Sequence, residues 1–206
     1  MGPDNHEQEI EVKFYVRRLA EIEPRLLGLG ARLIQKRTFE VNLRFDTPQG
    51  KFKRERRILR LRRDEAVRLT YKDGSTMKDG AVIRREIEFA VDNFDSAKQF
   101  IEALGYEVVF MYEKYRTTYE LDGAHIMLDE LPYGDFAEIE GEMDLLKPIA
   151  KKLGLNWDAA IPASYAALFE HVCESRGFAF RDLSFENFEG MKIKAKDLEV
   201  ISADQN

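Results

Sequence analysis

Charged side chains at alternate positions are the residues of this sequence that could do chemistry. Near the N-terminus, Glu9, Glu11 and Lys13 share one side of an alternating segment, and Glu138 and Glu140 repeat the same spacing later. Two carboxylates two residues apart on a strand project from one face, so they can reach one hard cation together. Oxygen ligands of this kind favour Mg²⁺ or Mn²⁺ over zinc.

Lysines and arginines hold the equivalent positions in the middle of the chain. They are Arg60, Arg62, Arg68, Lys72, Arg84, Lys114 and Arg116. Carboxylates dominate the first and last segments, whereas cations dominate three segments between them. One interpretation is that each charged face meets water, as one side of an antiparallel sheet does. The other is that the faces point into a closed barrel, whose interior admits side chains or a small ligand.

The elements that position these charges are mostly β-strands, because the apolar residues alternate with the charged ones. Strands are expected over residues 7–16, 31–37, 40–46, 58–63, 66–72, 85–91, 106–121, 124–129 and 136–142. Helices are expected over 19–29, 95–104 (capped by Asp95), 143–153 and 163–176, and turns over 47–50, 73–75 and 132–134. The predicted class is therefore α+β and mainly antiparallel β, with peripheral helices. Residues 1–189 are expected to form one domain, and residues 190–206 a charged, mobile tail.

Composition excludes several classes of protein. The 206 residues suffice for one large domain, and a net charge of -6 argues against a general nucleic-acid binder. A single cysteine, Cys173, excludes an intramolecular disulfide framework and a multi-thiolate zinc site. There is no apolar run of membrane-spanning length and no signal segment at the N-terminus, so we expect a cytoplasmic protein without a membrane partner.

A barrel interior lined with like charges needs compensation, because a buried unpaired ion is strongly destabilising. Pairing of arginine with glutamate across the interior is one solution, and it would be structural. The other is a ligand with many negative charges, held by the cations and bridged to the carboxylates by a divalent metal. A polyphosphate chain fits that description.

Six motifs in order resemble the CYTH proteins, the triphosphate tunnel metalloenzymes, which include class IV adenylyl cyclases and thiamine triphosphatases. The resemblance covers about residues 7–177, and its first motif is similar to the ExExK signature. The motifs are Glu9-Ile10-Glu11-Val12-Lys13, Leu59-Arg60-Leu61-Arg62, Leu69-Thr70-Tyr71-Lys72, Arg85-Glu86-Ile87-Glu88, Lys114-Tyr115-Arg116, and Leu128-Asp129-Glu130 with Glu138-Ile139-Glu140-Gly141.

The resemblance implies an eight-stranded antiparallel tunnel that binds a small-molecule triphosphate together with Mg²⁺ or Mn²⁺, in a family that contains homodimers. It assigns the metal to Glu9, Glu11, Asp129, Glu138 and Glu140. It assigns the triphosphate to Lys13, Arg60, Arg62, Lys72, Lys114 and Arg116, with Arg84, Glu86 and Glu88 added to the lining. Of these, Lys13, Lys72, Lys114 and Arg116 are also the expected catalytic residues.

Two reactions fit that set of metal- and triphosphate-binding residues, and neither needs a protein nucleophile. Attack by water on a terminal phosphorus gives a triphosphatase acting on inorganic, thiamine or nucleoside triphosphate. Attack by the ribose 3′-hydroxyl of ATP on the α-phosphorus gives an adenylate cyclase. Cyclase-type relatives resemble one another in a His-Phe pair before ExExK, but here His6 precedes Glu7, which favours hydrolysis. A third hypothesis is a polyphosphate- or nucleotide-binding module without turnover. His6, His125 and His171 are expected to be surface or structural residues.

Overall fold

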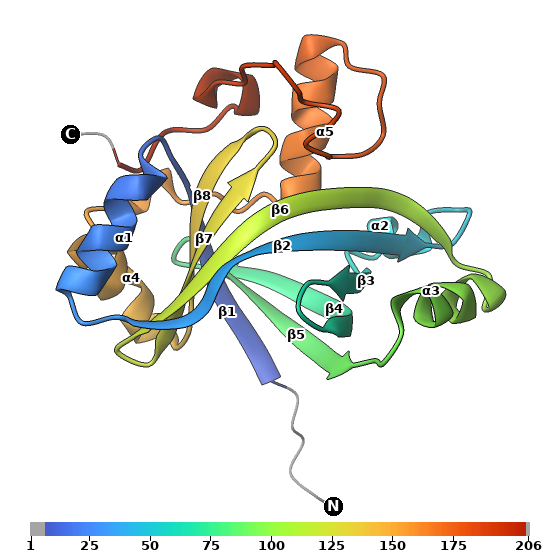
Figure 1. Ribbon diagram of the computed structural model, residues 1–206, viewed down its shortest axis with the longest axis horizontal. Helices are drawn as coiled ribbons and strands as arrows, with labels where there is room; N and C mark the ends of the chain where they lie inside the picture. The colour runs from blue at the N-terminus through green and yellow to red at the C-terminus, as the bar shows by residue number, and fades with distance from the viewer. Residues whose placement is uncertain (1–6, 205–206) are drawn as a thin grey trace, which may run out of the picture.

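A ring of eight antiparallel strands forms the centre of the protein in the computed structural model, which describes residues 7–204 (Figure 1). The ring closes in the order β1-β5-β4-β3-β2-β6-β7-β8, with β8 paired to β1. The strands are β1 (Glu7–Val16), β2 (Arg32–Asp46), β3 (Ile58–Arg63), β4 (Val67–Lys78), β5 (Ala81–Ala90), β6 (Glu107–Leu121), β7 (Ala124–Leu131) and β8 (Gly134–Glu140). This confirms the expected eight-stranded, tunnel-like α+β fold.

The alternation along β1 shows how the ring sorts its side chains. Val12, Phe14 and Val16 are at most 1% exposed and belong to the outer apolar core, whereas Glu9 and Lys13 line the interior. A strand must present successive side chains to opposite faces, so the ionic residues of one parity are placed inside together.

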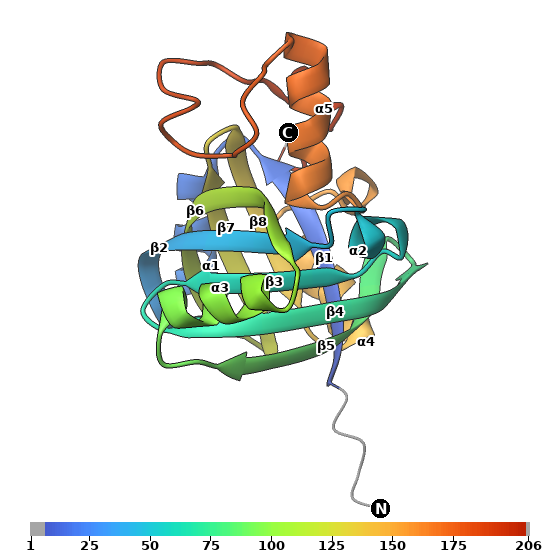
Figure 2. The ribbon, with the colours of Figure 1, turned by 90° about the vertical axis from the view of Figure 1, so that its right-hand side faces the viewer.

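Helices cover the apolar outside of the ring (Figures 1 and 2). The helix α1 (Leu19–Gly28) and the helix α4 (Met143–Lys152) pack through Ile22, Leu26 and Leu146 against β1, β7 and β8. The helix α3 (Phe94–Ala103) covers β3 and β6 on another side. The short helix α2 (Lys51–Arg54) connects β2 to β3, and α5 (Tyr165–Arg176) stands at one end of the ring. None of the helices within residues 7–204 is long and apolar enough to cross a bilayer.

Three local predictions are wrong. The expected turn at 73–75 is a register shift inside a longer β4, where Gly74 adopts a φ of +64°, and the chain turns instead at Asp79 and Gly80. The strands expected over 31–37 and 40–46 are one strand, β2, with irregular pairing to β6. The cap of α3 is the Asn93 side chain, which accepts a hydrogen bond from the backbone N–H of Ser96, and not Asp95.

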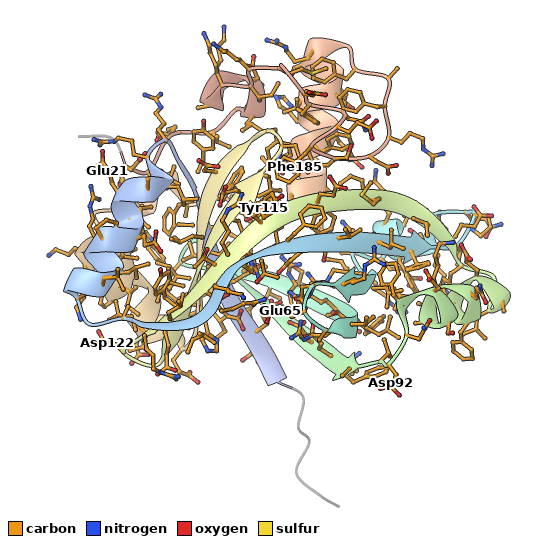
Figure 3. All side chains as sticks on the ribbon, in the orientation of Figure 1. Glu21, Glu65, Asp92, Tyr115, Asp122 and Phe185 are labelled. Atoms are coloured by element: carbon orange, nitrogen blue, oxygen red, sulfur yellow. The ribbon has the colours of Figure 1, made fainter. Side chains whose placement is uncertain are left out.

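The C-terminal segment packs on the ring and on α5. Leu183 exchanges backbone hydrogen bonds with β6, and the Phe185 ring lies 5.3 Å from that of Tyr115 (Figure 3). Residues 190–204, expected to form a separate tail, contact the domain through the 3₁₀ helix η2 (Ala195–Leu198) and through Asp204. The Asp204 carboxylate accepts hydrogen bonds from the backbone N–H groups of residues 17 and 18. The apolar residues of this segment are irregularly spaced, and they pack against α5.

Candidate functional site

The interior of the ring holds a cavity of about 840 Å³ whose lining residues are mostly charged. Within the described residues, nine lysines and arginines and nine aspartates and glutamates line it. The cations are Lys13, Arg44, Arg60, Arg62, Arg68, Lys72, Arg84, Lys114 and Arg116, and the carboxylates are Glu9, Glu11, Glu40, Asp64, Glu86, Glu88, Glu138, Glu140 and Glu142. With every group ionised, the charges of the lining therefore sum to zero before any ligand binds.

The structure brings nearly all the predicted site residues to this cavity. Every predicted triphosphate-binding cation lines it, as do Glu86, Glu88 and four of the five carboxylates assigned to metal. Asp129 is the exception: it is fully buried behind the lining. Of the histidines, His125 lines the cavity, His171 lies on α5 with its Nε2 3.7 Å from Glu199, and His6 is outside the described residues.

An acidic wall forms where β1 meets β8. Glu11 and Glu140 are directly opposite in the antiparallel register, a placement that is destabilising for like charges. Burial, followed by the charges of Glu9 and Glu11, raises the pKa of Glu140 to about 7. One carboxylate oxygen of Glu9 accepts a hydrogen bond from Lys72, and its other oxygen is buried without a hydrogen-bond partner.

This acidic wall fits a divalent cation by its chemistry. All its donors are carboxylate oxygens, one of them buried without a hydrogen-bond partner, and their mutual repulsion is what a cation would relieve. Within residues 7–204, no three such ligands are already arranged around one point. Cations of the lining pair with two of the three carboxylates instead: Lys72 binds Glu9, and the Arg84 guanidinium lies 3.1 Å from Glu11. Metal binding here therefore requires some of these ion pairs to open.

Glu138 differs from its neighbours on the acidic wall. Its carboxylate lies 3.2 Å from the Lys13 ammonium and also pairs with Arg116. Burial opposes ionisation, but Lys13 and Arg116 hold the pKa of Glu138 well below its usual range. In this arrangement Glu138 positions two of the predicted catalytic cations.

Asp129 binds several side chains that line or border the cavity. It accepts hydrogen bonds from Lys114 Nζ at 3.0 Å, from Arg116 Nε at 2.6 Å and from the Tyr165 hydroxyl at 2.8 Å. Tyr165 is the first residue of α5, whose N-cap is Ser164, and its ring lies 4.2 Å from the Lys13 ammonium. The carboxylate is thus fully engaged by these donors, and Asp129 fixes the direction in which Lys114 and Arg116 point.

Sequence reasoning missed two charged lining residues on β2, Glu40 and Arg44. Glu40 lies 3.5 Å from Lys114 and 3.7 Å from Arg62. Burial would raise the pKa of Glu40, but Lys114, Arg116 and Arg62 lower it to about 2, so the carboxylate is a fixed negative charge between them. The signal was available, because Glu40, Asn42 and Arg44 alternate along a segment expected to be a strand.

A protein-family model and several solved structures match this chain. The family model described as CYTH domain matches residues 7–146. A protein of Vibrio parahaemolyticus, provisionally named an adenylate cyclase, is 22% identical, with a TM-score of 0.70 over 78% of this chain and 97% of that one.

Two further solved structures are similar. One is a protein of Pyrococcus horikoshii that is 27% identical, with a TM-score of 0.65 over 76% of this chain and 96% of that one. A protein of Hippeastrum is 20% identical, with a TM-score of 0.59 over 79% and 95% of the two chains. No curated protein sequence matches the chain.

Proposed function

This chain belongs to the CYTH domain family, and we propose that it is a divalent-metal-dependent phosphohydrolase that acts on a triphosphate inside the charged cavity. One observation carries the proposal: the cavity lining combines a wall of repelling carboxylates with a dense set of cations, and in the lining as a whole nine carboxylates match nine cations. A bare triphosphate would leave that balance strongly negative, whereas a triphosphate with divalent cations would keep it close to neutral.

The residues divide the work by charge. A divalent cation held by Glu9, Glu11 and Glu140 would neutralise charge on the phosphoryl oxygens. It would also act as a Lewis acid toward the reacting oxygens. Arg60, Arg62, Lys72, Lys114 and Arg116 donate to phosphoryl oxygens and stabilise the charge that develops in the transition state. Glu40 and Asp129 hold several of these donors in place, so little reorganisation is needed when the reaction occurs.

Hydrolysis is favoured over cyclisation. The Hippeastrum relative, provisionally an adenylyl cyclase, has a dominant triphosphatase activity. The sequence also lacks the His-Phe pair that cyclase-type relatives carry before ExExK. Adenylate cyclase activity is the second candidate, because the Vibrio relative is named for it and both reactions use the same cavity.

Phosphorus NMR of the protein with Mg²⁺, or with Mn²⁺ that is chelated before the spectrum is recorded, tests the proposal. Tripolyphosphate, thiamine triphosphate and ATP are supplied separately. We expect orthophosphate release from at least one of them, and none in EDTA. Cyclic AMP with pyrophosphate from ATP would identify a cyclase instead, and binding without any product would identify a binding module.

The variant Glu9→Gln connects that activity to the cavity. We expect it to abolish metal-dependent turnover with an unchanged circular dichroism spectrum, because it removes one charge from the acidic wall and leaves the outer core intact. The matched control is Glu107→Gln, which changes an exposed glutamate of β6 that does not line the cavity. Full activity in Glu9→Gln would remove this residue from the metal site.

A further inference from the structure

Arg44 is the cavity-lining cation that lacks a carboxylate. The other eight lysines and arginines of the lining each have an acidic group within 4.0 Å. These pairs include Lys13–Glu138, Arg60–Glu88, Arg62–Glu40, Arg68–Asp64, Lys72–Glu9, Arg84–Glu11, Lys114–Asp129 and Arg116–Asp129. Among the described side chains of residues 8–204, no such partner exists for Arg44, and its side chain makes no hydrogen bond to these residues.

The groups around Arg44 make the electrostatic energy of its unpaired charge more unfavourable. In the register of β2 and β3, Arg44 is directly opposite Arg60, so two guanidinium groups start from adjacent backbone positions on the same face. Burial lowers the pKa of Arg44; Tyr112 opposes that effect, and Arg60 and Arg84 add to it. Glu170 is the carboxylate that acts on Arg44 from a distance, but Lys53 binds Glu170 at 2.8 Å.

This basic pair faces the acidic one. In the ring, two strands separate β3 from β1 on one side, and two separate β2 from β8 on the other. The Arg44–Arg60 seam and the Glu11–Glu140 seam therefore lie on opposite walls of the cavity. An arginine keeps its charge even when partly buried, so an anion bound between the two guanidinium groups would relieve the repulsion.

We propose that Arg44 is a further substrate-binding residue, which together with Arg60 holds an anionic oxygen of the phosphate chain at the end of the cavity near α2. This assignment rests on the proposed function, since it takes the anion to be that of the triphosphate. Arg44 lies two residues before Asp46, whose carboxylate accepts hydrogen bonds from the backbone N–H groups of Phe52 and Lys53 in α2. Figure 2 shows α2 at this end of the ring, next to α5.

The test measures stability and affinity on the same variants. We expect Arg44→Gln to raise the melting temperature of the ligand-free protein, because it removes one of two repelling charges. The same change should weaken the calorimetric affinity for tripolyphosphate with Mn²⁺ by about ten- to a hundredfold, the range for a lost hydrogen bond between charged groups. Arg44→Lys should keep part of the affinity without the gain in stability.

The matched control is Lys36→Gln, which removes a positive charge from an exposed position on β2 outside the cavity lining. It should leave the affinity unchanged. A lower melting temperature with unchanged affinity in Arg44→Gln would show a structural role and overturn the assignment. Tripolyphosphate that binds without turnover, and binds less well to Arg44→Gln, would support Arg44 while contradicting the proposed hydrolysis. Absence of binding to the wild-type protein would contradict both.

Discussion

At the scale of single residues, the cavity contains many ion pairs, and like charges beside them repel one another. Glu40, Asp129 and Glu138 are each held by two or more cations, so their carboxylates serve to position those cations. Glu140 differs, because one of its two register partners, Glu11 on β1, is another carboxylate, and the other is His125 on β7. Ionisation of Glu140 should therefore lower the stability of the metal-free protein.

The pH dependence of stability follows from the raised pKa of Glu140. The folded protein holds this proton up to about pH 7, whereas the unfolded chain releases it near 4.5, the ordinary value for glutamate. Stability therefore falls as the pH rises through this window, by up to about 3 kcal/mol for one group. Glu140→Gln mimics the protonated form and should avoid that loss.

We expect Glu140→Gln to unfold at higher urea concentration than the wild-type protein at pH 8 in EDTA, and at a similar concentration at pH 5. A variant that is less stable than wild type at pH 8 would show that the Glu140 carboxylate is already compensated.

At the scale of elements, the turn between β7 and β8 is tied to β1 through a single glycine. Gly134 has a φ of +147°, and a Cβ there would lie 2.8 Å from a ring carbon of Tyr15. That ring packs on Phe136, which in turn contacts Tyr165 of α5. The turn therefore affects where β8 places Glu138 and Glu140 in the cavity.

Gly134→Ala should lower the free energy of unfolding by about 1–3 kcal/mol, because it adds backbone strain and a steric clash in the core. Gly28→Ala is the matched control, since no atom lies within 4 Å of the place its new methyl group would occupy and alanine favours the helix. Equal stability of the two variants in urea denaturation would contradict the account of this turn.

The strands were predictable because their side-chain period is two, and this alone places Glu9, Glu11 and Lys13 on one face. The turn at residues 73–75 was not, because Gly74 serves a register shift with the same residue types that make turns. The partners of Asp129 were equally hidden from sequence. They come from β6 and from α5, and only the folded ring brings Tyr165 onto that carboxylate.

At the scale of the whole molecule, the charge is distributed unevenly between inside and outside. The cavity is balanced, so the excess of acidic residues behind the net charge of -6 lies elsewhere on the chain. A negative exterior disfavours binding of long polyanions to the surface. Entry of a phosphate chain is then favourable only where the lumen cations are concentrated and where a metal can balance the added charge.

Coupling between metal and triphosphate is the most direct measure of this account. Calorimetry of tripolyphosphate binding to the wild-type protein would be compared in EDTA and in saturating Mn²⁺. The balanced lining predicts an affinity about tenfold or more higher with the metal, within the usual range of coupling between two ligands. Equal affinities in the two buffers would contradict the claim that opposed acidic and basic walls bind a metal–triphosphate pair.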